Sequence, residues 1–309
     1  MKNNKVSGKH RDQILRNEYI SSAAENIFNY VENNFSKADI HIHTNYSDST
    51  STVNEVLDYV QEKTDLMVVA ITDHDTIDGA IEAKRIAQEK MYRFEVIIGE
   101  EISTLDGHVL GLFLTKPIAP FLSTHKTLVE IHKQKGIAIA SHPFYQSRLK
   151  DFGEPVADGV GATILINEKH HFDALEIING TPVFGKANVK AKYFNRLLLF
   201  KAEVGGSDAH IYNAIGKGYT VFEGKTAKDL RWAIKHRETQ ALKSRWYPLA
   251  LFKYAYAFLP HAIRMAFFTM LLGPHPKKRE IINFPSRIKI HRELSNQEKQ
   301  EHSILRDLK

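Results

Sequence analysis

The chain has 309 residues, 43% of them hydrophobic and 25% charged, which is ordinary for a soluble globular protein and leaves enough apolar side chains for a sizeable core. It contains no cysteine, so disulfide bonds and thiolate metal sites are excluded and a reducing compartment is favoured. The first 30 residues lack the apolar segment of a secretory signal, so we expect a cytoplasmic protein.

The net charge of +6 is concentrated at the end of the chain. Residues 245–309 carry 12 Lys/Arg and 5 Asp/Glu, a net charge of about +7, which leaves about −1 for the rest. A basic segment of this kind is typical of contact with a polyanion or an anionic lipid surface. A solvated, solubilising segment has the same composition, so both interpretations stay open.

The first elements in chain order are a polar tail and a helix. Residues 1–17 are predicted to be disordered. Within 18–35, apolar residues recur at helical spacing, which predicts an amphipathic helix packed on the domain that follows. We therefore assign 1–37 to an N-terminal tail and helix, 38–244 to one large domain, and 245–309 to a C-terminal extension.

Short apolar runs then alternate with segments of helical pattern. Strands are predicted at 38–43, 66–72, 94–98, 108–114, 136–140, 174–178 and 202–205, and helices at 53–63, 76–90, 123–135 and 186–200. This alternation predicts βαβ units, a mainly parallel sheet and an α/β fold, and a closed βα barrel would place its chemistry at the carboxyl ends of the strands. Residues 144–173 interrupt the rhythm and are predicted to be a loop-rich insertion over that end.

Histidines and carboxylates gather where the predicted strands begin or end. The five motifs are His41-Ile-His43 with Ser47-Asp48, Asp73-His74, Gly99-Glu100-Glu101, Ser141-His142-Pro143 and Ser207-Asp208-Ala209-His210. Since these ends meet at one rim of a barrel, the set predicts a polynuclear metal centre built from imidazole and carboxylate. Such centres commonly carry out hydrolysis at phosphorus.

Several positions in these motifs have more than one interpretation. His41 and His43 share one face of a strand, where they could converge on a cation or simply be half buried. Asp48 could be a ligand or could cap the following helix. Either member of Asp73-His74 could ligate while the other orients it. Alternation along the strand allows only one of Glu100 and Glu101 to point inward.

The later motifs differ in strength. A single histidine that opens a strand, as His108 does, is more often structural than a ligand. Proline after His142 stops the strand and fixes the turn. Asp208 and His210 follow the pair Gly205-Gly206, which allows the backbone to approach a crowded site closely.

The charges of such a centre suit a phosphate ester. Three divalent ions would keep about three positive charges after Asp48, Glu101 and Asp208 bind them, because histidine binds as the neutral ring. This excess would accept a phosphate dianion together with hydroxide. The sequence contains neither a P-loop nor a Gly-x-Gly-x-x-Gly fingerprint, so nucleoside triphosphate and dinucleotide chemistry are unsupported.

On these residues the chain resembles the PHP family (polymerase and histidinol phosphatase) over roughly residues 38–240. The motifs that carry the resemblance are HIHTNYSD at 41–48, TDHDT at 72–76, GEEIS at 99–103, HVLGLF at 108–113, SHP at 141–143 and GSDAH at 206–210. The resemblance implies a distorted seven-stranded, TIM-like βα barrel that holds two or three divalent ions, with manganese, iron and zinc equally suited to the ligands.

The resemblance also assigns the ligands. It implies one metal on His41, His43, Glu101 and Asp208, a second on Glu101, His108 and His142, and a third on Asp48, His74 and His210. It makes Glu101 the bridging carboxylate and His108 a ligand. Asp208, His210 and Glu101 are then the expected catalytic residues.

The stand-alone members of the family that look most similar are nucleoside 3′,5′-bisphosphate phosphatases and 5′-to-3′ exoribonucleases of short RNA. The resemblance thus implies a metal-dependent phosphoesterase whose metal-bound hydroxide attacks a small phosphorylated substrate, a nucleotide or short oligonucleotide. The predicted substrate contacts are Arg148, Lys192, Asn179 and Asn188. The alternative is a non-catalytic, metal-stabilised binding module that could associate with a membrane.

The C-terminal extension has no counterpart in the resemblance. Residues 246–273 are apolar and aromatic, but two prolines and two charges disfavour a membrane span. Together with the basic residues up to 279 they could lie in a membrane interface, as a peripheral contact. The other interpretation is a pair of helices packed on the barrel or on a second subunit.

Overall fold

The computed structural model describes residues 30, 34–145, 150–151, 154–155, 159–246, 251–252 and 254–256. The chain divides into two compact units, 1–254 and 255–309, and nearly all described residues belong to the first. The predicted disorder of 1–17, most of the helix at 18–35 and most of the extension 245–309 lie outside the described residues. Within the described part of the chain, every helix is too short or too polar to cross a bilayer.

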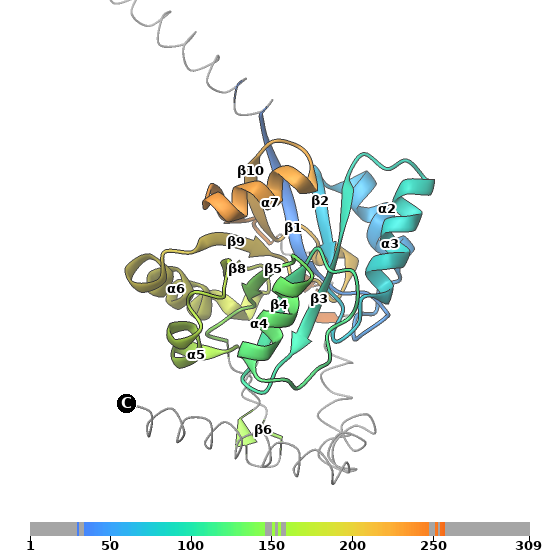
Figure 1. Cartoon of the computed structure of the whole chain (residues 1–309). Helices are drawn as coiled ribbons and strands as arrows, with labels where there is room; N and C mark the ends of the chain where they lie inside the picture. Colours follow the sequence, from blue (N-terminus) through green and yellow to red (C-terminus); the bar gives the residue numbers. More distant parts are fainter. Residues whose placement is uncertain are drawn as a thin grey trace, which may run out of the picture. The chain divides into compact units, whose positions relative to one another are not determined.

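The first unit is an alternation of strands and helices (Figure 1). Its first half contains β1 (Phe35–Ile42), α2 (Val53–Lys63), β2 (Leu66–Ile71), α3 (Asp78–Glu89), β3 (Glu95–Ser103) and β4 (His108–Leu112). Its second half contains α4 (Thr124–Lys133), β5 (Ile137–Ala140), β6 (Lys150–Asp151), β7 (Glu154–Pro155), α5 (Gly161–Asn167), β8 (Ala174–Asn179), α6 (Gly185–Phe194), β9 (Ala202–Gly206), β10 (Gly218–Glu223), α7 (Ala227–His236) and β11 (Thr239–Lys243).

Nine strands form one mixed sheet in the order β11-β10-β1-β2-β3-β4-β5-β8-β9. The pairs β1–β2, β2–β3, β5–β8 and β8–β9 are parallel, whereas β3–β4, β4–β5, β1–β10 and β10–β11 are antiparallel. The expectation of a mainly parallel sheet was therefore wrong. The reason is physical: a buried antiparallel strand such as β4 is covered on both faces, so its apolar run reads like that of a parallel strand.

The sheet curls until β9, at one edge, returns to β1. Ile42 at the end of β1 bridges to Ala209 just beyond β9, and the Asp208 amide donates a hydrogen bond of 2.8 Å to the His41 carbonyl. The α/β fold with a nearly closed, barrel-shaped sheet is thereby confirmed. The closure brings the beginning and the end of the domain together at one rim.

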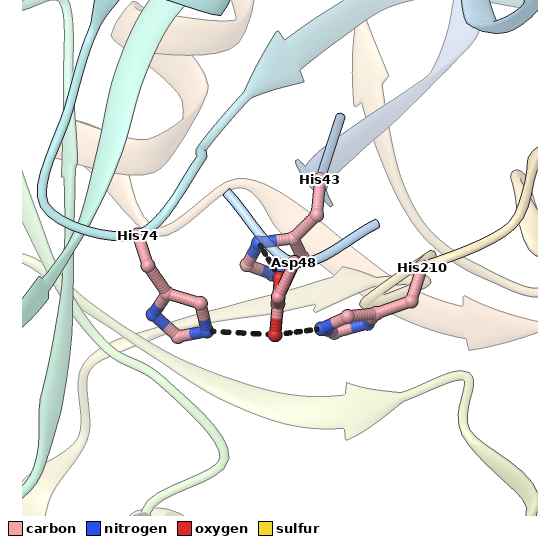
Figure 2. A group of neighbouring side chains, drawn as sticks. All are labelled: His43, Asp48, His74 and His210. Carbon is pink, nitrogen blue, oxygen red and sulfur yellow. Dashed lines mark hydrogen bonds and ion pairs between the residues drawn. The ribbon is translucent and has the colours of Figure 1, made fainter. Parts of the chain in front are cut away.

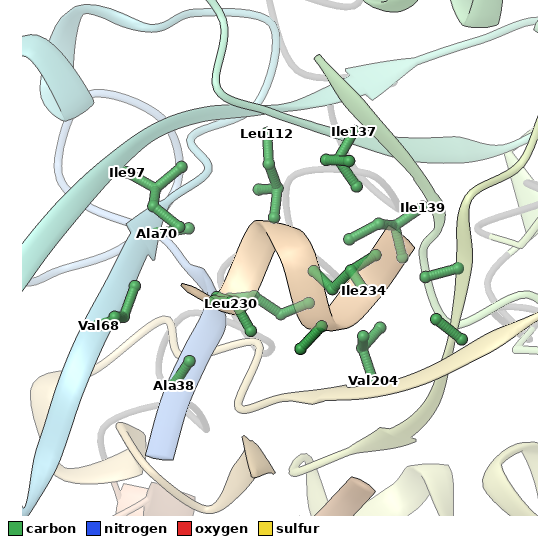
Figure 3. Close-up of a cluster of buried hydrophobic side chains, with 14 of the residues drawn as sticks. Ala38, Val68, Ala70, Ile97, Leu112, Ile137, Ile139, Val204, Leu230 and Ile234 are labelled. Atoms are coloured by element: carbon green, nitrogen blue, oxygen red, sulfur yellow. The ribbon is translucent and has the colours of Figure 1, made fainter. Parts of the chain in front are cut away.

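Helix α7 fills the opposite end of this sheet. A capping box between Thr226 and Asp229 starts the helix. Figure 3 shows its residues Leu230 and Ile234 among apolar side chains of the surrounding strands, and all of them are buried. The strand residues that Figure 3 labels in this cluster are Ala38, Val68, Ala70, Ile97, Leu112, Ile137, Ile139 and Val204.

Helices α4, α5 and α6 cover an outer face of the sheet. Leu128 of α4, Leu165 of α5 and Ala191 of α6 belong to one buried cluster with Val109 of β4 and Leu175 of β8. These apolar contacts hold the strands in place from the outer side of the sheet, and the same strands end at the rim.

Several elements differ from the prediction. Strand β3 continues to Ser103 instead of ending at 98, and β10, α7 and β11 were not predicted at all. The helix expected at 186–200 is α6 followed by a π-helical turn at Asn195–Leu199. Among its described residues, the interval 144–173 contains the short strands β6 and β7 and helix α5.

Candidate metal centre

All nine predicted ligands lie together at the rim where β1 and β9 meet. We call them the rim group: His41, His43, Asp48, His74, Glu101, His108, His142, Asp208 and His210. They come from the ends of β1, β2, β3, β5 and β9, the loops that follow these strands, and the start of β4. The topology explains the convergence, because the curled sheet brings these strand ends to one rim.

Glu101 is the centre of the rim group. Its Oε2 lies 3.0 Å from His41 Nε2, 3.2 Å from His43 Nε2 and 3.5 Å from His74 Nε2. Its Oε1 lies 3.3 Å from His108 Nδ1 and 3.1 Å from His142 Nε2. One buried carboxylate therefore faces five imidazoles, which is the position that a bridging ligand would need.

Asp208 completes the inner part of the rim group. Its Oδ1 lies 3.4 Å from His41 Nε2 and 3.2 Å from His43 Nε2. His41, His43, Glu101 and Asp208 thus offer four mutually close and fully buried ligand atoms. This is the same foursome that the resemblance assigned to one metal.

A second, more exposed part of the rim group surrounds Asp48 (Figure 2). Asp48 Oδ2 lies 3.1 Å from His210 Nε2 and 3.8 Å from His74 Nε2, and Asp48 Oδ1 lies 3.7 Å from His43 Nδ1. The Asp48 side chain is 44% exposed, whereas the His43 side chain is fully buried. The Asp48 part of the rim group is therefore more open to solvent than the part around Glu101 and His43.

The neighbouring acids that competed with these ligands have other positions. Asp73 accepts hydrogen bonds from the amide and hydroxyl of Thr44, both at 2.7 Å, and from the hydroxyl of Ser47. It thereby holds the loop that carries Asp48, while His74 points to the rim. Glu100 lies on the outer side of β3, where it accepts a hydrogen bond of 2.9 Å from the Ile118 amide.

The rim group fits divalent metal ions. Four of its buried ring nitrogens make no hydrogen bond within the described chain: His43 Nδ1 and Nε2, His108 Nδ1 and His142 Nδ1. His43 Nε2 and His108 Nδ1 lie within 3.3 Å of carboxylate oxygens, yet they lack hydrogen-bond geometry. Unpaired buried nitrogens are costly, and a cation shared with the adjacent oxygens would satisfy them.

Charge coupling within the rim group is strong. Burial alone would raise the pKa of Glu101, but the surrounding histidines, above all His41, hold it well below its usual range. Burial alone would lower the pKa of His43, but Asp208 and Glu101 raise it to about 10. His74 differs, because burial lowers its pKa to about 4. Protons therefore occupy part of the rim group when no cation is bound.

Backbone conformation at the rim is unusual at two ligand positions. Asp208 has a φ of 54° and His142 a φ of 24°, in the left-handed region that costs energy for residues other than glycine. Gly206 has a different constraint, because a Cβ there would lie 2.5 Å from the Cβ of His41. The expected close approach at Gly205-Gly206 is thus observed at Gly206.

Sequence reasoning missed Glu176, which lies in β8 with its side chain fully buried. Its Oε1 lies 2.9 Å from His41 Nδ1, and its Oε2 accepts a hydrogen bond of 2.8 Å from the His142 amide. Glu176 therefore orients two members of the rim group from behind. The available signal was a lone carboxylate in the apolar run Ala174–Asn179.

Asn179 and Asn188 lie behind the rim group. The Asn179 side-chain amide donates to Glu176 Oε2 at 3.2 Å and to Asp208 Oδ2 at 3.1 Å. Asn188 binds the backbone of Asn179 through its amide oxygen and nitrogen, at 3.0 and 2.8 Å. These bonds give both residues an orienting role, and their predicted contact with substrate stays a prediction.

Of the two predicted basic contacts, the structure describes only Lys192. Lys192 is exposed in the last turn of α6, and among the described residues no contact joins it to the rim group. Arg148 lies outside the described residues. An aromatic pair lies beside His142: Tyr145 stacks on the buried Phe184 with ring centroids 3.8 Å apart, and Phe184 lies 5.5 Å from the His142 ring.

Comparisons with known sequences find relatives of this chain. A family profile described as PHP-associated matches residues 185–239, from α6 to the start of β11. The uncharacterized protein MJ1587 of Methanocaldococcus jannaschii is 42% identical over 133 residues, which cover 40% of this chain and 75% of that protein. The uncharacterized protein MJ0417 of the same organism is 27% identical over 191 residues, 60% of this chain and 70% of that protein.

Solved structures share the fold at low sequence identity. A two-domain protein from Bacteroides vulgatus, described as containing a predicted PHP-like metal-dependent phosphoesterase, matches with a TM-score of 0.53 and 19% identity over 68% of this chain. The match spans 65% of the length of that protein. PsfC from Pseudomonas syringae matches with a TM-score of 0.52 and 16% identity over 71% of this chain and 96% of its own.

Proposed function

We propose that this chain, which belongs to one family with the MJ1587 protein, is a metal-dependent phosphoesterase. The match of residues 185–239 to the PHP-associated profile supports membership of the wider PHP family. The Bacteroides vulgatus protein of similar fold is described in the same terms, which supports the proposal. The seven strands β1, β2, β3, β4, β5, β8 and β9 would then be the distorted barrel of the family, with β10 and β11 outside it.

The observation that carries this proposal is the environment of Glu101. A carboxylate that is 1% exposed faces five imidazoles within 3.5 Å, and a second buried carboxylate, Asp208, faces two of the same rings. An apolar or hydrogen-bonded core would not leave four buried ring nitrogens without hydrogen bonds. Clustered divalent ions on such ligands are typical of phosphoryl chemistry.

The bound ions and the residues behind the rim group would have distinct tasks in this reaction. Bound divalent ions would polarise the phosphoryl group and lower the pKa of a water ligand. Glu176 fixes the His41 ring from behind through its 2.9 Å contact, so the other ring nitrogen of His41 faces Glu101 and Asp208. Asn179 holds the second oxygen of Asp208, which leaves Oδ1 toward the histidines. These residues fix geometry before substrate arrives.

We further propose a nucleotide or short oligonucleotide as substrate. Tyr145 stacks on the buried Phe184, and its ring centroid lies 6.3 Å from that of His142, so a nucleobase whose phosphate reaches the rim group could pack near this aromatic pair. The assignment to nucleoside bisphosphate phosphatases or to exoribonucleases of short RNA rests on the sequence motifs alone.

The remaining expectations are also proposals. They are the domain boundaries before residues 38 and 245, the cytoplasmic location, the substrate contacts by Arg148 and Lys192, and the peripheral membrane contact through 246–279. The binding-module alternative makes a distinct prediction, namely metal binding without turnover.

The first experiment tests the chemistry. Purified protein is incubated with p-nitrophenyl phosphate and manganese, zinc or iron(II), and Asp208→Asn is compared with the parent protein by turnover and circular dichroism. We expect metal-dependent hydrolysis that falls by about 10³-fold in a folded variant. Bound metal without hydrolysis of any phosphate ester would favour the binding module.

A second experiment tests the substrate class. Hydrolysis of a nucleoside 5′-monophosphate, a nucleoside 3′,5′-bisphosphate and a 5′-phosphorylated trinucleotide is compared with that of ribose 5-phosphate, which has no base. We expect Tyr145→Leu to weaken kcat/KM by about 10-fold for the base-containing substrates and to leave ribose 5-phosphate unchanged. Equal effects on both kinds of substrate would contradict base stacking.

A further inference from the structure

A second group of histidine and carboxylate ligands lies outside the rim. It consists of His125 in the first turn of α4, Glu168 directly after α5, and His171 in the turn that precedes β8. We call these three residues the surface group. Their ligand atoms all lie within 4.8 Å of one another, yet none of the three belongs to the motifs that built the rim group.

The two histidines converge on one carboxylate oxygen. His125 Nδ1 lies 2.9 Å and His171 Nδ1 lies 3.0 Å from Glu168 Oε2, with the two rings at 88° and their centroids 5.0 Å apart. Glu168 is 17% exposed at its side chain, so its carboxylate is largely removed from water. Two imidazole nitrogens and one carboxylate oxygen are the types of ligand that zinc binds.

The decisive detail is at His171. Its Nδ1 is buried and makes no hydrogen bond within the described chain, although Glu168 Oε2 is only 3.0 Å away. The same combination, a short distance to a carboxylate without hydrogen-bond geometry, occurs in the rim group at His43 and His108. A cation between the nitrogen and the oxygen would satisfy both.

Another surface pair shows what the ordinary arrangement looks like. His132 and Asp173 make a regular hydrogen bond of 3.1 Å, as His125 and Glu168 do, and Asp173 also accepts the Ala138 amide at 2.8 Å, but no histidine comparable to His171 lies unpaired beside them in the described chain. That pair has no third ligand in the described chain. It therefore serves as an internal control for the surface group.

We propose that His125, Glu168 and His171 form a separate structural site for a divalent transition metal such as zinc. Two imidazoles and one carboxylate leave a fourth position for water. The His125 side chain is 53% exposed, so the ion could enter from solvent. This site neither depends on the phosphoesterase reaction nor contributes to it directly.

The position of the surface group gives the site a structural purpose. It would tie α4 to the end of α5, and the residues just before α5 lie against the rim group. Gly159 bridges to His108, and the Gly161 amide donates to the Pro143 carbonyl at 2.9 Å. A metal at the surface group would therefore restrain the segment that packs on His108 and on the turn after His142.

The test uses the full-length protein and zinc alone. Crystals soaked in zinc chloride are measured above and below the zinc absorption edge, and zinc bound in solution is counted after equilibrium dialysis. We expect an anomalous peak between His125, Glu168 and His171. We also expect His125→Gln with His171→Gln to bind about one zinc ion fewer per chain than the parent, while His132→Gln binds the same number.

The outcomes separate this inference from the proposed function. A peak at the rim group with none at the surface group would overturn the inference and leave the phosphoesterase proposal untouched. Equal zinc counts in the double variant and the parent protein would overturn it as well. Because the anomalous measurement needs no substitution, the test stands even if the double variant does not fold.

Discussion

The two ends of the barrel-shaped sheet use the same strands for opposite purposes. On β3, the inner position of Ile97 belongs to the apolar cluster around α7, and four residues later Glu101 faces five imidazoles. On β9, Val204 belongs to that cluster, and Asp208 just beyond the strand belongs to the rim group. Every second side chain of a strand points to the same face of the sheet. Side chains along one face therefore belong to the apolar core at one end and to the rim group at the other.

This contrast shows where the stability of the fold comes from. Buried apolar side chains around α7 contribute favourable free energy, whereas buried carboxylates and imidazoles cost free energy unless they are paired or bind a cation. The rim group can therefore be assembled only because the α7 end and the outer helices hold the strands. Separate perturbations of the two ends should have different consequences.

The largest expected effect comes from the centre of the rim. Glu101→Gln removes the charge that faces five imidazoles, and we expect kcat/KM to fall by about 10³-fold together with loss of bound metal. Steady-state kinetics with added manganese and metal analysis measure both effects.

Its neighbour on β3 provides the matched control. Glu100 points outward, and burial raises the pKa of its carboxyl to about 8, so it is largely uncharged near neutral pH. We therefore expect Glu100→Gln to keep kcat/KM within about threefold of the parent value. Comparable losses in the two variants would contradict the assignment of the two faces of β3.

A substitution at the α7 end should lower the stability of the protein without changing metal binding at the rim group. Leu230 of α7 is fully buried in the inner cluster, so Leu230→Ala is expected to lower the free energy of unfolding by about 2–5 kcal/mol. Urea denaturation measures this loss, and metal content at 25 °C should equal that of the parent protein. Loss of metal at unchanged stability would argue against the division of tasks between the two ends.

A smaller effect is expected behind the rim. Glu176→Gln removes the charge that faces His41 Nδ1, and we expect metal affinity to fall by about 10–100-fold without unfolding. Glu203→Gln is the control, because Glu203 of β9 pairs with the exposed Arg196 and lies outside the rim group. Competition with a fluorescent chelator measures the affinities. Equal affinities of the two variants would remove the orienting role of Glu176.

The smallest effect concerns pH. Asp208 and Glu101 raise the pKa of His43 to about 10 despite its burial, so this ring carries a proton at pH 7 that a metal must displace. Affinity should therefore rise with pH, by up to about tenfold per unit for each displaced proton. Calorimetry in two buffers of different ionisation enthalpy should detect proton release. Metal binding without it would show that the histidines are already neutral.

Local sequence signals located most of the elements and most of the rim group, and the family resemblance added His108. Helix α2 has its predicted bounds, because its apolar face and its Thr52/Glu55 capping box are both local features. The polar motifs near the strand ends were recognised because they stand out after apolar runs, although the end of β3 was placed at 98 instead of Ser103. Glu101 and Glu100 were separated by the family resemblance, and the structure gives the physical reason in the two faces of β3.

Long-range features could not be read from the sequence. The antiparallel direction of β4 depends on its neighbours β3 and β5, and an apolar run has no direction. The β10–α7–β11 segment was missed because β10 alternates between buried and half-buried residues instead of forming a continuous apolar run. Glu176 was missed for a related reason: a buried acid is recognisable only once its partners, His41 and the His142 amide, are known.

The account depends most on cations between Glu101, Asp208, Asp48 and their histidines, and anomalous diffraction from crystals soaked in manganese tests this directly. We predict one peak surrounded by His41, His43, Glu101 and Asp208, and at least one more beside Asp48 and His210. A rim without anomalous density at millimolar manganese and neutral pH, in a protein folded as described here, would contradict it.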